Sequence, residues 1–133
     1  MTDKDELGRL GEAAAAKLLK REGYRIIERN VSNAYGEIDI VAVEGASRWS
    51  GEKGELAFVE VKTRTDDGMG APEEAVTRPK QAHIIRAALA YVQAKGLDDY
   101  PMRFDVVGVE FDERGRPVCN LIRAAFTAED GGW

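Results

Sequence analysis

Residues 55–64, ELAFVEVKTR, decide how the rest of the chain is interpreted. The run is rich in strand-forming residues, and no Gly or Pro interrupts it. Because side chains alternate along a strand, one face is apolar at its start and ends in Glu60, Lys62 and Arg64. Burying three charges at the end of an apolar strand costs free energy unless they meet partners or a metal ion.

Residues 36–44, GEIDIVAVE, combine a strand pattern with charge in the same way. Alternation predicts that one face carries Ile38, Ile40 and Ala42 and the other carries Glu37, Asp39, Val41 and Val43. If the two stretches form a hairpin through residues 45–54, they run antiparallel, and Asp39 lies across from Glu60 with Lys62 next along that face. The pattern therefore predicts two carboxylates and an amine in one place.

Length and composition indicate a single globular domain. The chain has 133 residues, of which 44% are hydrophobic and 32% charged. The net charge of −5 argues mildly against strong non-specific phosphate binding, although a bound divalent metal would supply positive charge locally. Cys119 is the sole cysteine, so no internal disulfide can form. With a charged start and no long apolar run, we expect a cytoplasmic protein that does not contact membranes.

The remaining helices and strands are predicted from the periodicity of apolar residues and from the residues that begin or end such elements. We predict a helix over residues 5–22, a short strand over 24–29 and a turn over 30–35. A long helix should begin after Thr77, carry Pro79 in its first turn and end near Lys95, where Gly96 stops it. Strands are expected over 102–111 and 118–126. Residues 66–70 form a Gly-containing loop suited to opening and closing over a site, and residues 72–76 a helical turn.

These elements predict a mixed five-stranded sheet flanked by two main helices, in the order α-β-β-β-α-β-β. The strand at 55–64, the long helix and the strand at 102–111 form a β-α-β unit, which makes those two strands parallel. The spacing of apolar residues predicts a buried stripe on each helix: Leu7, Leu10, Ala14 and Leu18 on the first, and Ile85, Ala88, Leu89 and Val92 on the second.

The predicted charge cluster suits a hard divalent cation. Mg²⁺ takes oxygen ligands and typically uses one or two carboxylates, which Asp39 and Glu60 would provide. A metal held there can lower the pKa of bound water, and Lys62 can orient that water or stabilise developing charge. The alternative is a cross-strand ion-pair cluster at an exposed end of the sheet. The chain contains no phosphate-binding loop or nucleophile-elbow motif that would provide a rival centre.

Asp39 followed by Glu60-Val61-Lys62 resembles the D…(D/E)-x-K signature of the PD-(D/E)XK nucleases, with Ile38 where the broad signature has proline. GEIDIV at 36–41 and FVEVKTR at 58–64 more closely resemble the YraN family, predicted endonucleases similar to archaeal Holliday junction resolvases. The resemblance covers about residues 7–107. It is supported by Gly8, Gly11-Glu12, Gly23-Tyr24, Asn30, Lys80-Gln81 and Arg103-Phe104-Asp105.

The resemblance implies an α/β fold with a restriction-endonuclease-like core, and we expect residues 1–126 to form one nuclease-like domain. Residues 127–133, TAEDGGW, show no periodicity and are expected to form a disordered tail. It implies Mg²⁺ or Mn²⁺ as cofactor and nucleic acid, most of all DNA, as partner. Glu12 would join Asp39 and Glu60 as a metal ligand, since small neighbours let its helix approach the sheet; its alternative is an exposed helix glutamate. Resolvase-like action would suit a homodimer.

Several further residues have both a functional and an ordinary interpretation. Glu37 either extends the metal shell or is a solvated strand residue, and Arg64 either binds phosphate or is a solvated strand end. Gln81 either points into the site or bonds nearby backbone at the start of its helix. His83 is expected on the helix surface, and Asp105 is expected to be structural, pairing with Arg103 or a helix start. A basic face for nucleic acid would be formed by Arg78, Lys80, His83 and Arg86, with Arg64 beside them.

The sequence thus predicts a metal-dependent phosphodiesterase acting on structured or branched DNA. Asp39, Glu60 and Lys62 would be its catalytic residues. The alternative is a non-catalytic module that binds nucleic acid or protein on a nuclease-like core.

Overall fold

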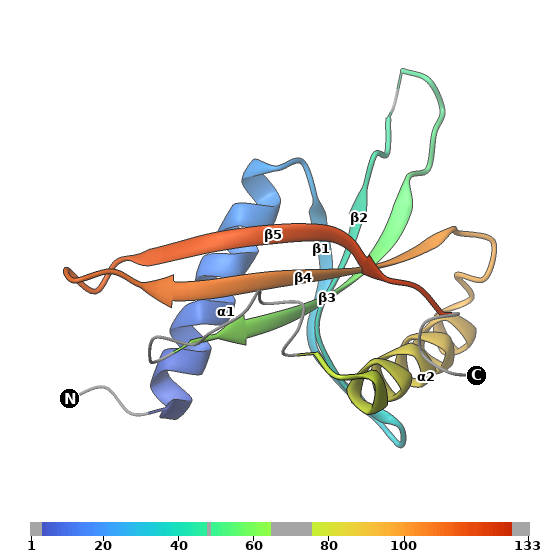
Figure 1. Ribbon diagram of the computed structural model, residues 1–133. Coiled ribbons are helices and arrows are strands. Elements are labelled where there is room, and N and C mark those ends of the chain that lie inside the picture. The colour runs from blue at the N-terminus through green and yellow to red at the C-terminus, as the bar shows by residue number, and fades with distance from the viewer. Residues whose placement is uncertain (1–3, 48, 65–75, 129–133) are drawn as a thin grey trace.

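The computed structural model describes residues 4–47, 49–64 and 76–128, which form one five-stranded sheet with two helices (Figure 1). The helices are α1 (Lys4–Arg21) and α2 (Arg78–Lys95). The strands are β1 (Arg25–Asn33), β2 (Gly36–Glu44), β3 (Glu55–Thr63), β4 (Met102–Phe111) and β5 (Pro117–Phe126). The predicted element order and mixed α/β fold are therefore confirmed.

The strands lie in the sheet in the order in which they occur in the chain, β1-β2-β3-β4-β5. β3 and β4 are parallel, as expected for strands joined through a helix, and the other neighbouring pairs are antiparallel. In the β2–β3 hairpin the paired residues run from Glu44↔Glu55 to Ile40↔Val59. Continuing this register by one residue on each strand places Asp39 opposite Glu60, as the sequence pattern predicted.

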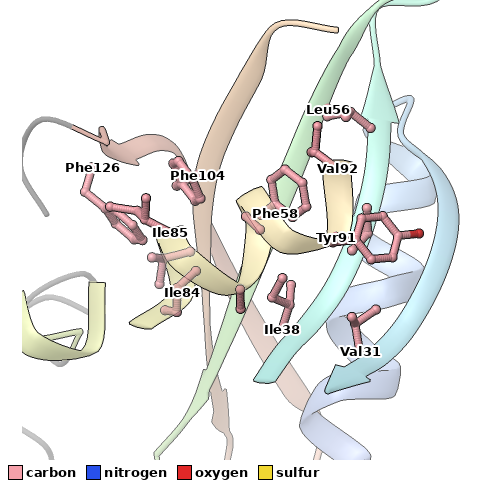
Figure 2. Packing of buried hydrophobic residues seen from close by; sticks show 14 of the residues in the cluster. Val31, Ile38, Leu56, Phe58, Ile84, Ile85, Tyr91, Val92, Phe104 and Phe126 are labelled. Carbon is pink, nitrogen blue, oxygen red and sulfur yellow. The ribbon is translucent and has the colours of Figure 1, made fainter. Parts of the chain in front are cut away.

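Two apolar clusters cover opposite faces of the sheet, one beneath each helix. The cluster under α2 contains large side chains from the strands and helix, including Phe58, Phe104, Phe126, Ile85 and Tyr91 (Figure 2). The cluster under α1 combines larger residues such as Leu19 and Ile40 with the alanines at positions 15, 16, 42 and 57. Small residues on both surfaces let α1 lie close to the centre of the sheet.

The buried faces of the two helices differ from the predicted stripes. In α1 the buried residues are Gly11, Ala15, Ala16 and Leu19, whereas Leu10 is 47% exposed. In α2, Ile85, Ala88 and Val92 are buried as expected. Leu89 is instead 38% exposed, and the additional buried residues are Ile84, Ala87 and Tyr91. The prediction for α1 was wrong because the helix turns the face with Gly11, Ala15 and Leu19 toward the sheet, where glycine and alanine permit a close approach.

The predicted alternation in β2 is also wrong at one point. Ile38 packs under α2 with Val41 and Val43, while Ile40 and Ala42 pack under α1. The alternation therefore breaks at Asp39, whose carboxylate accepts a hydrogen bond from the backbone N–H of Val61 at 2.8 Å. A side chain replaces the strand backbone as acceptor at this position, so the buried N–H stays satisfied although the ladder ends.

The turn after β1 is shorter than predicted. β1 continues through Asn30 to Asn33, and only Ala34 and Tyr35 form the turn. Asn30 keeps its place in the strand with a positive φ of 56°. Asn tolerates this left-handed conformation better than most residues, which explains how a turn-like sequence lies within a strand.

The boundaries of α2 agree with the sequence signals. Thr77 precedes the helix, Pro79 lies in its first turn, and Gly96 ends it in the left-handed conformation with φ 66°. The predicted loop at residues 66–70, the turn at residues 72–75 and most of the predicted tail, 129–133, lie outside the described residues. None of the helices in the described part of the chain is both long and apolar enough to cross a membrane.

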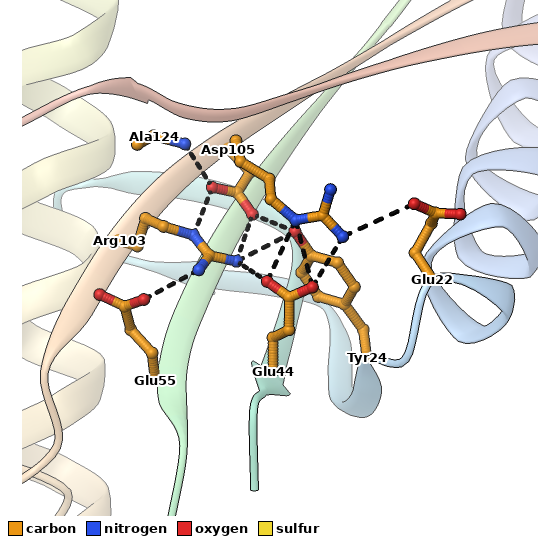
Figure 3. Close-up of polar contacts among 8 residues, drawn as sticks. Glu22, Tyr24, Glu44, Glu55, Arg103, Asp105 and Ala124 are labelled. Atoms are coloured by element: carbon orange, nitrogen blue, oxygen red, sulfur yellow. Dashed lines mark hydrogen bonds and ion pairs between the residues drawn. The ribbon is translucent and has the colours of Figure 1, made fainter.

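A polar network joins β2, β3 and β4 to the chain after α1 (Figure 3). Asp105 is fully buried and accepts hydrogen bonds from Tyr24 Oη at 2.7 Å, Arg103 Nε at 2.9 Å and Ala124 N at 2.9 Å. Arg103 also donates to Glu44 and Glu55. Asp105 therefore has the structural role expected for it, with Arg103 as partner, because a buried carboxylate requires such satisfaction.

Candidate functional site

The β2–β3 hairpin brings Asp39 and Glu60 together on the sheet. Glu60 is only 8% exposed although it is charged, and Asp39 is fixed by its hydrogen bond from Val61 N. The strands place both residues because their pairing ends one step before them, at Ile40↔Val59. Two carboxylates are thus held close together in a partly buried place, as the sequence predicted.

The electrostatics of this pair favour a cation. Burial, and next the negative charge of Glu60, raise the pKa of Asp39 to about 7, with a further contribution from Glu12. The hydrogen bond from Val61 and the charge of Lys80 act in the opposite direction but do not offset them. The ionised form of Asp39 is therefore disfavoured in the absence of a further cation, and strongly shifted carboxyl groups of this kind are common at functional sites.

Lys80 of α2 reaches the same pair from the other side. Its Nζ lies 3.3 Å from Glu60 Oε1. Burial works against the charged form of Lys80, but a hydrogen bond with Lys62 and the charge of Glu60 outweigh it and raise the pKa of Lys80. The structure thus places Lys80, expected at phosphate, against a predicted metal ligand.

Lys62 interacts with Lys80, and its pKa is shifted in the opposite direction. The hydrogen bond from Lys80, and then burial, lower the pKa of Lys62 below its ordinary value. The charge of Lys80 adds to this effect, while the charges of Glu60 and Asp39 raise the pKa of Lys62. Lys62 therefore interacts with a second amine as well as with the two carboxylates of the site.

Glu12 reaches the site from α1 because the helix lies very close to β3. A Cβ at Gly11 would overlap Thr63 Oγ1, so only glycine permits this approach. Glu12 is largely buried and forms an ion pair with Arg29 Nη2 at 3.4 Å. Its charge also raises the pKa of Asp39, which places it within electrostatic reach of the pair.

A cavity of about 600 Å³ opens beside these groups. Asp39, Glu12 and Lys62 line it together with Asp5, Gly8, Arg9, Val61 and Thr63. The lining is mainly polar and lies between the first half of α1 and the end of β3. This volume is within the range of small-ligand sites and leaves space beside the carboxylates for a substrate group.

The other predicted residues have more ordinary surroundings. Glu37 is exposed near the start of β2. Gln81 donates a hydrogen bond to the backbone oxygen of Val76 at 2.9 Å, the second of its two expected roles. Arg78, His83 and Arg86 are exposed on α2. Arg64 follows the end of β3, where its backbone N–H donates to Val109 O.

Two residues near the site were not identified from the sequence. Arg29 on β1 pairs with Glu12, and Arg9 lines the cavity one turn before Glu12 on α1. The helical spacing of Arg9 and Glu12 was the only available signal. Among the described residues, no three Asp, Glu, His or Cys side chains are gathered closely enough to form a metal site as they stand. The carboxylate pair and the Glu12–Arg29 ion pair are accordingly separate features of this geometry.

The chain matches a known family over most of its length. The family described as "Uncharacterised protein family UPF0102" matches residues 11–109. UPF0102 protein STH1475 of Symbiobacterium thermophilum is 48% identical over 122 residues, covering 92% of this chain and 97% of the relative. A UPF0102 protein of Syntrophus aciditrophicus is 43% identical over 126 residues, covering 95% and 92%.

Among solved structures, this chain resembles one described as "The structure of Pyrococcus Furiosus SfsA in complex with Ca2+". The two are 15% identical with a TM-score of 0.34. The match covers 89% of this chain and spans 63% of the length of the other.

Proposed function

We propose that this chain, which belongs to the uncharacterised protein family UPF0102, is a metal-dependent phosphodiesterase that cuts structured or branched DNA. The observation that carries the proposal is the Asp39–Glu60 pair, held together although burial and mutual charge raise the pKa of Asp39 to about 7. A carboxyl group whose pKa is raised by burial and by a second carboxylate, and which lines a cavity, is typical of functional sites.

The donor set fits Mg²⁺ or Mn²⁺. Both carboxylates supply oxygen atoms, one or two carboxylates are typical of such sites, and a bound cation would favour the ionised form of Asp39, which burial and Glu60 disfavour. Asp39 and Glu60 would hold the ion, and Glu12 would assist from α1 by turning from Arg29 toward them. A divalent cation bound there lowers the pKa of bound water and neutralises charge on a phosphoryl oxygen.

Two lysines of the chain would orient the attacking water and contact the substrate phosphate. Lys62 lines the cavity and would orient the attacking water through its amine. The raised pKa of Lys80 keeps its amine charged, and this amine can turn from Glu60 to a phosphate of the substrate. Both roles use groups that the structure already gathers around the two carboxylates.

Cleavage of a labelled nucleic-acid panel tests this proposal. The panel contains duplex, single-stranded, flapped and four-way-junction DNA, together with RNA, each with Mg²⁺ and with Mn²⁺. Asp39→Ala and Lys62→Ala should lower the cleavage rate by at least about 100-fold because each removes a group acting at the reacting phosphate. The exposed Asp98→Ala and Lys17→Ala are matched controls and should cut at the wild-type rate.

Calorimetric titration with Mn²⁺ accompanies the cleavage assay. Binding to the wild type that is lost in Asp39→Ala supports the metal site even where the panel lacks the preferred substrate. If folded wild-type protein neither cuts the panel nor binds Mn²⁺ through Asp39, the catalytic proposal is wrong and a non-catalytic binding module remains.

A further inference from the structure

Helix α2 is a basic element in an acidic protein. Its 18 residues, RPKQAHIIRAALAYVQAK, include no Asp or Glu, while the whole chain has a net charge of −5. Arg78, His83 and Arg86 are exposed on it. The outer face of its first half is therefore complementary in charge to a phosphate backbone.

The turn between β1 and β2 is fastened to this helix. The Asn33 side chain donates from Nδ2 to the backbone oxygen of Ala87 at 3.0 Å, and its Oδ1 accepts from Tyr35 N at 3.0 Å. A Cβ built on Gly36 would lie 3.6 Å from His83 Cβ, so the turn packs directly against the helix. Figure 1 shows the β1–β2 turn lying beside α2. The turn is therefore held at a fixed position relative to the basic face.

Tyr35 projects from this fixed turn with 51% of its surface exposed. The local hydrogen bond from its own N–H to Asn33 fixes its backbone without covering the ring. An aromatic ring presented on a rigid turn that packs against a helix with exposed arginines combines the two features with which proteins bind unpaired nucleotides, a stacking surface and cations for phosphate. In a duplex the bases stack on each other, so the ring is of use only where a base is unpaired.

This surface adjoins the candidate site through both of its elements. Asp39 follows Tyr35 by four residues along β2, a distance of about 13 Å at the strand rise. Lys80, on the first turn of α2, contacts Glu60. About 13 Å spans at most about four nucleotides, the number reached at the duplex rise of about 3.4 Å per nucleotide.

We propose that Tyr35 stacks on an unpaired base while His83, Arg86 and Arg78 contact the phosphates of the same strand. The partner is DNA with unpaired nucleotides, located within about four nucleotides of the scissile phosphate. The position of the cut rests on the proposed function, whereas the binding surface itself does not. This assigns the chain a preference for flaps, gaps or open junctions over continuous duplex.

Binding without metal tests the surface independently of catalysis. Fluorescence anisotropy in EDTA measures the affinity for two probes, a labelled oligothymidine of about 20 nucleotides and a labelled duplex of about 20 base pairs. Tyr35→Ala should weaken oligothymidine binding by about 5- to 100-fold and leave duplex binding within about twofold. Tyr35→Phe should bind as the wild type does, because it keeps the ring.

Trp49→Ala is the matched aromatic control, since Trp49 is fully exposed in the loop between β2 and β3. It should not change binding to either probe. Equal loss with both probes, no loss on Tyr35→Ala, or a loss in Tyr35→Phe as large as in Tyr35→Ala would each overturn the stacking role. Circular dichroism and the melting temperature confirm that every variant compared is folded.

The phosphate contacts have a separate readout in the salt dependence of binding. Arg86→Gln should reduce the slope of log affinity against log salt by about 1 with oligothymidine. Arg25→Gln, at the opposite end of β1 from the turn, should leave the slope unchanged. An unchanged slope in Arg86→Gln would remove the basic face from the proposal. If the Tyr35 effects hold while the cleavage panel is negative, the surface stands and only the catalytic function fails.

Discussion

At the scale of single residues, Asp39 is the carboxyl group of the site whose pKa the structure raises. It accepts one backbone hydrogen bond, from Val61 N, while burial and the charge of Glu60 disfavour its ionised form. Asparagine has nearly the same shape and keeps an oxygen that can accept the bond from Val61. Replacing Asp39 by asparagine thus removes the charge without removing the contact.

We expect metal-free Asp39→Asn to be more stable than the wild type at pH 8. The pKa of Asp39 is about 7 in the folded protein against an ordinary value of 3.8, so between these values the folded protein holds a proton that the unfolded chain has lost. The wild type therefore loses stability as the pH rises from about 4 to about 7, and the variant does not. The gain should be roughly 1–3 kcal/mol at pH 8 and should vanish near pH 4.

Urea unfolding in EDTA at several pH values measures this difference, with Asp98→Asn as an exposed control that should show none. A variant less stable than the wild type at pH 8 would show that Asp39 stabilises the fold, as in an ordinary ion-pair network.

At the scale of secondary structure, α1 is positioned by one glycine. Gly11 faces Thr63 of β3 so closely that a Cβ would overlap its hydroxyl and lie 3.2 Å from its Cβ. Gly8, one turn earlier, has nothing within 4 Å of an added Cβ and lines the cavity. Gly11 is thus required by the contact with Thr63, whereas Gly8 borders the cavity and has space for a side chain.

Gly11→Ala should lower the free energy of unfolding by about 1–3 kcal/mol, because α1 must move away from β3 to make room. It should also reduce cleavage, since Glu12 moves with the helix. Gly8→Ala is the matched control and should raise stability by up to about 1 kcal/mol through helix propensity. Chemical denaturation of both variants makes the comparison, and equal effects would show that the contact with Thr63 does not set the position of the helix.

At the scale of the whole molecule, the sheet is tied together by a charged network at the opposite end of β2 from Asp39. Glu44 accepts hydrogen bonds from Arg103 Nη2 of β4 at 2.6 Å and from Arg123 Nη2 of β5 at 2.7 Å (Figure 3). The Arg123 hydrogen bond is the largest cause that lowers the pKa of Glu44; burial opposes it and Arg103 reinforces it. Strands that are not neighbours in the sheet are thereby connected through side chains.

Glu44→Gln should destabilise the protein by about 2 kcal/mol at pH 7, because it weakens hydrogen bonds to two charged groups. A depressed pKa stabilises the fold above the ordinary value of 4.5 and ceases to do so as the pH falls through the folded pKa. The difference between the wild type and Glu44→Gln should therefore shrink below about pH 4.5. Thermal unfolding from pH 3 to pH 7 measures it, with the exposed Glu52→Gln as control. A difference that does not change with pH would contradict this role.

The sequence alone determined the order of elements, the ends of α2 and the meeting of Asp39 with Glu60. These depend on local quantities, namely strand alternation, the propensities of single residues, and the signals of Pro79 and Gly96 at the two ends of α2. The family motifs that the sequence resembled are likewise local, and membership of UPF0102 is confirmed. Local patterns are reliable here because each residue acts on its immediate neighbours along the chain.

Only the tertiary structure decided which helix faces are buried, where β2 breaks its alternation and how the lysines are arranged. Gly11 is buried because it meets Thr63, Lys80 reaches Glu60 from another element, and Asn33 ties the Tyr35 turn to α2. Each of these contacts joins residues distant in sequence, so no spacing within one element encodes it. The physical reason is that packing and charge act through space, and the chain's folded path alone brings such partners together.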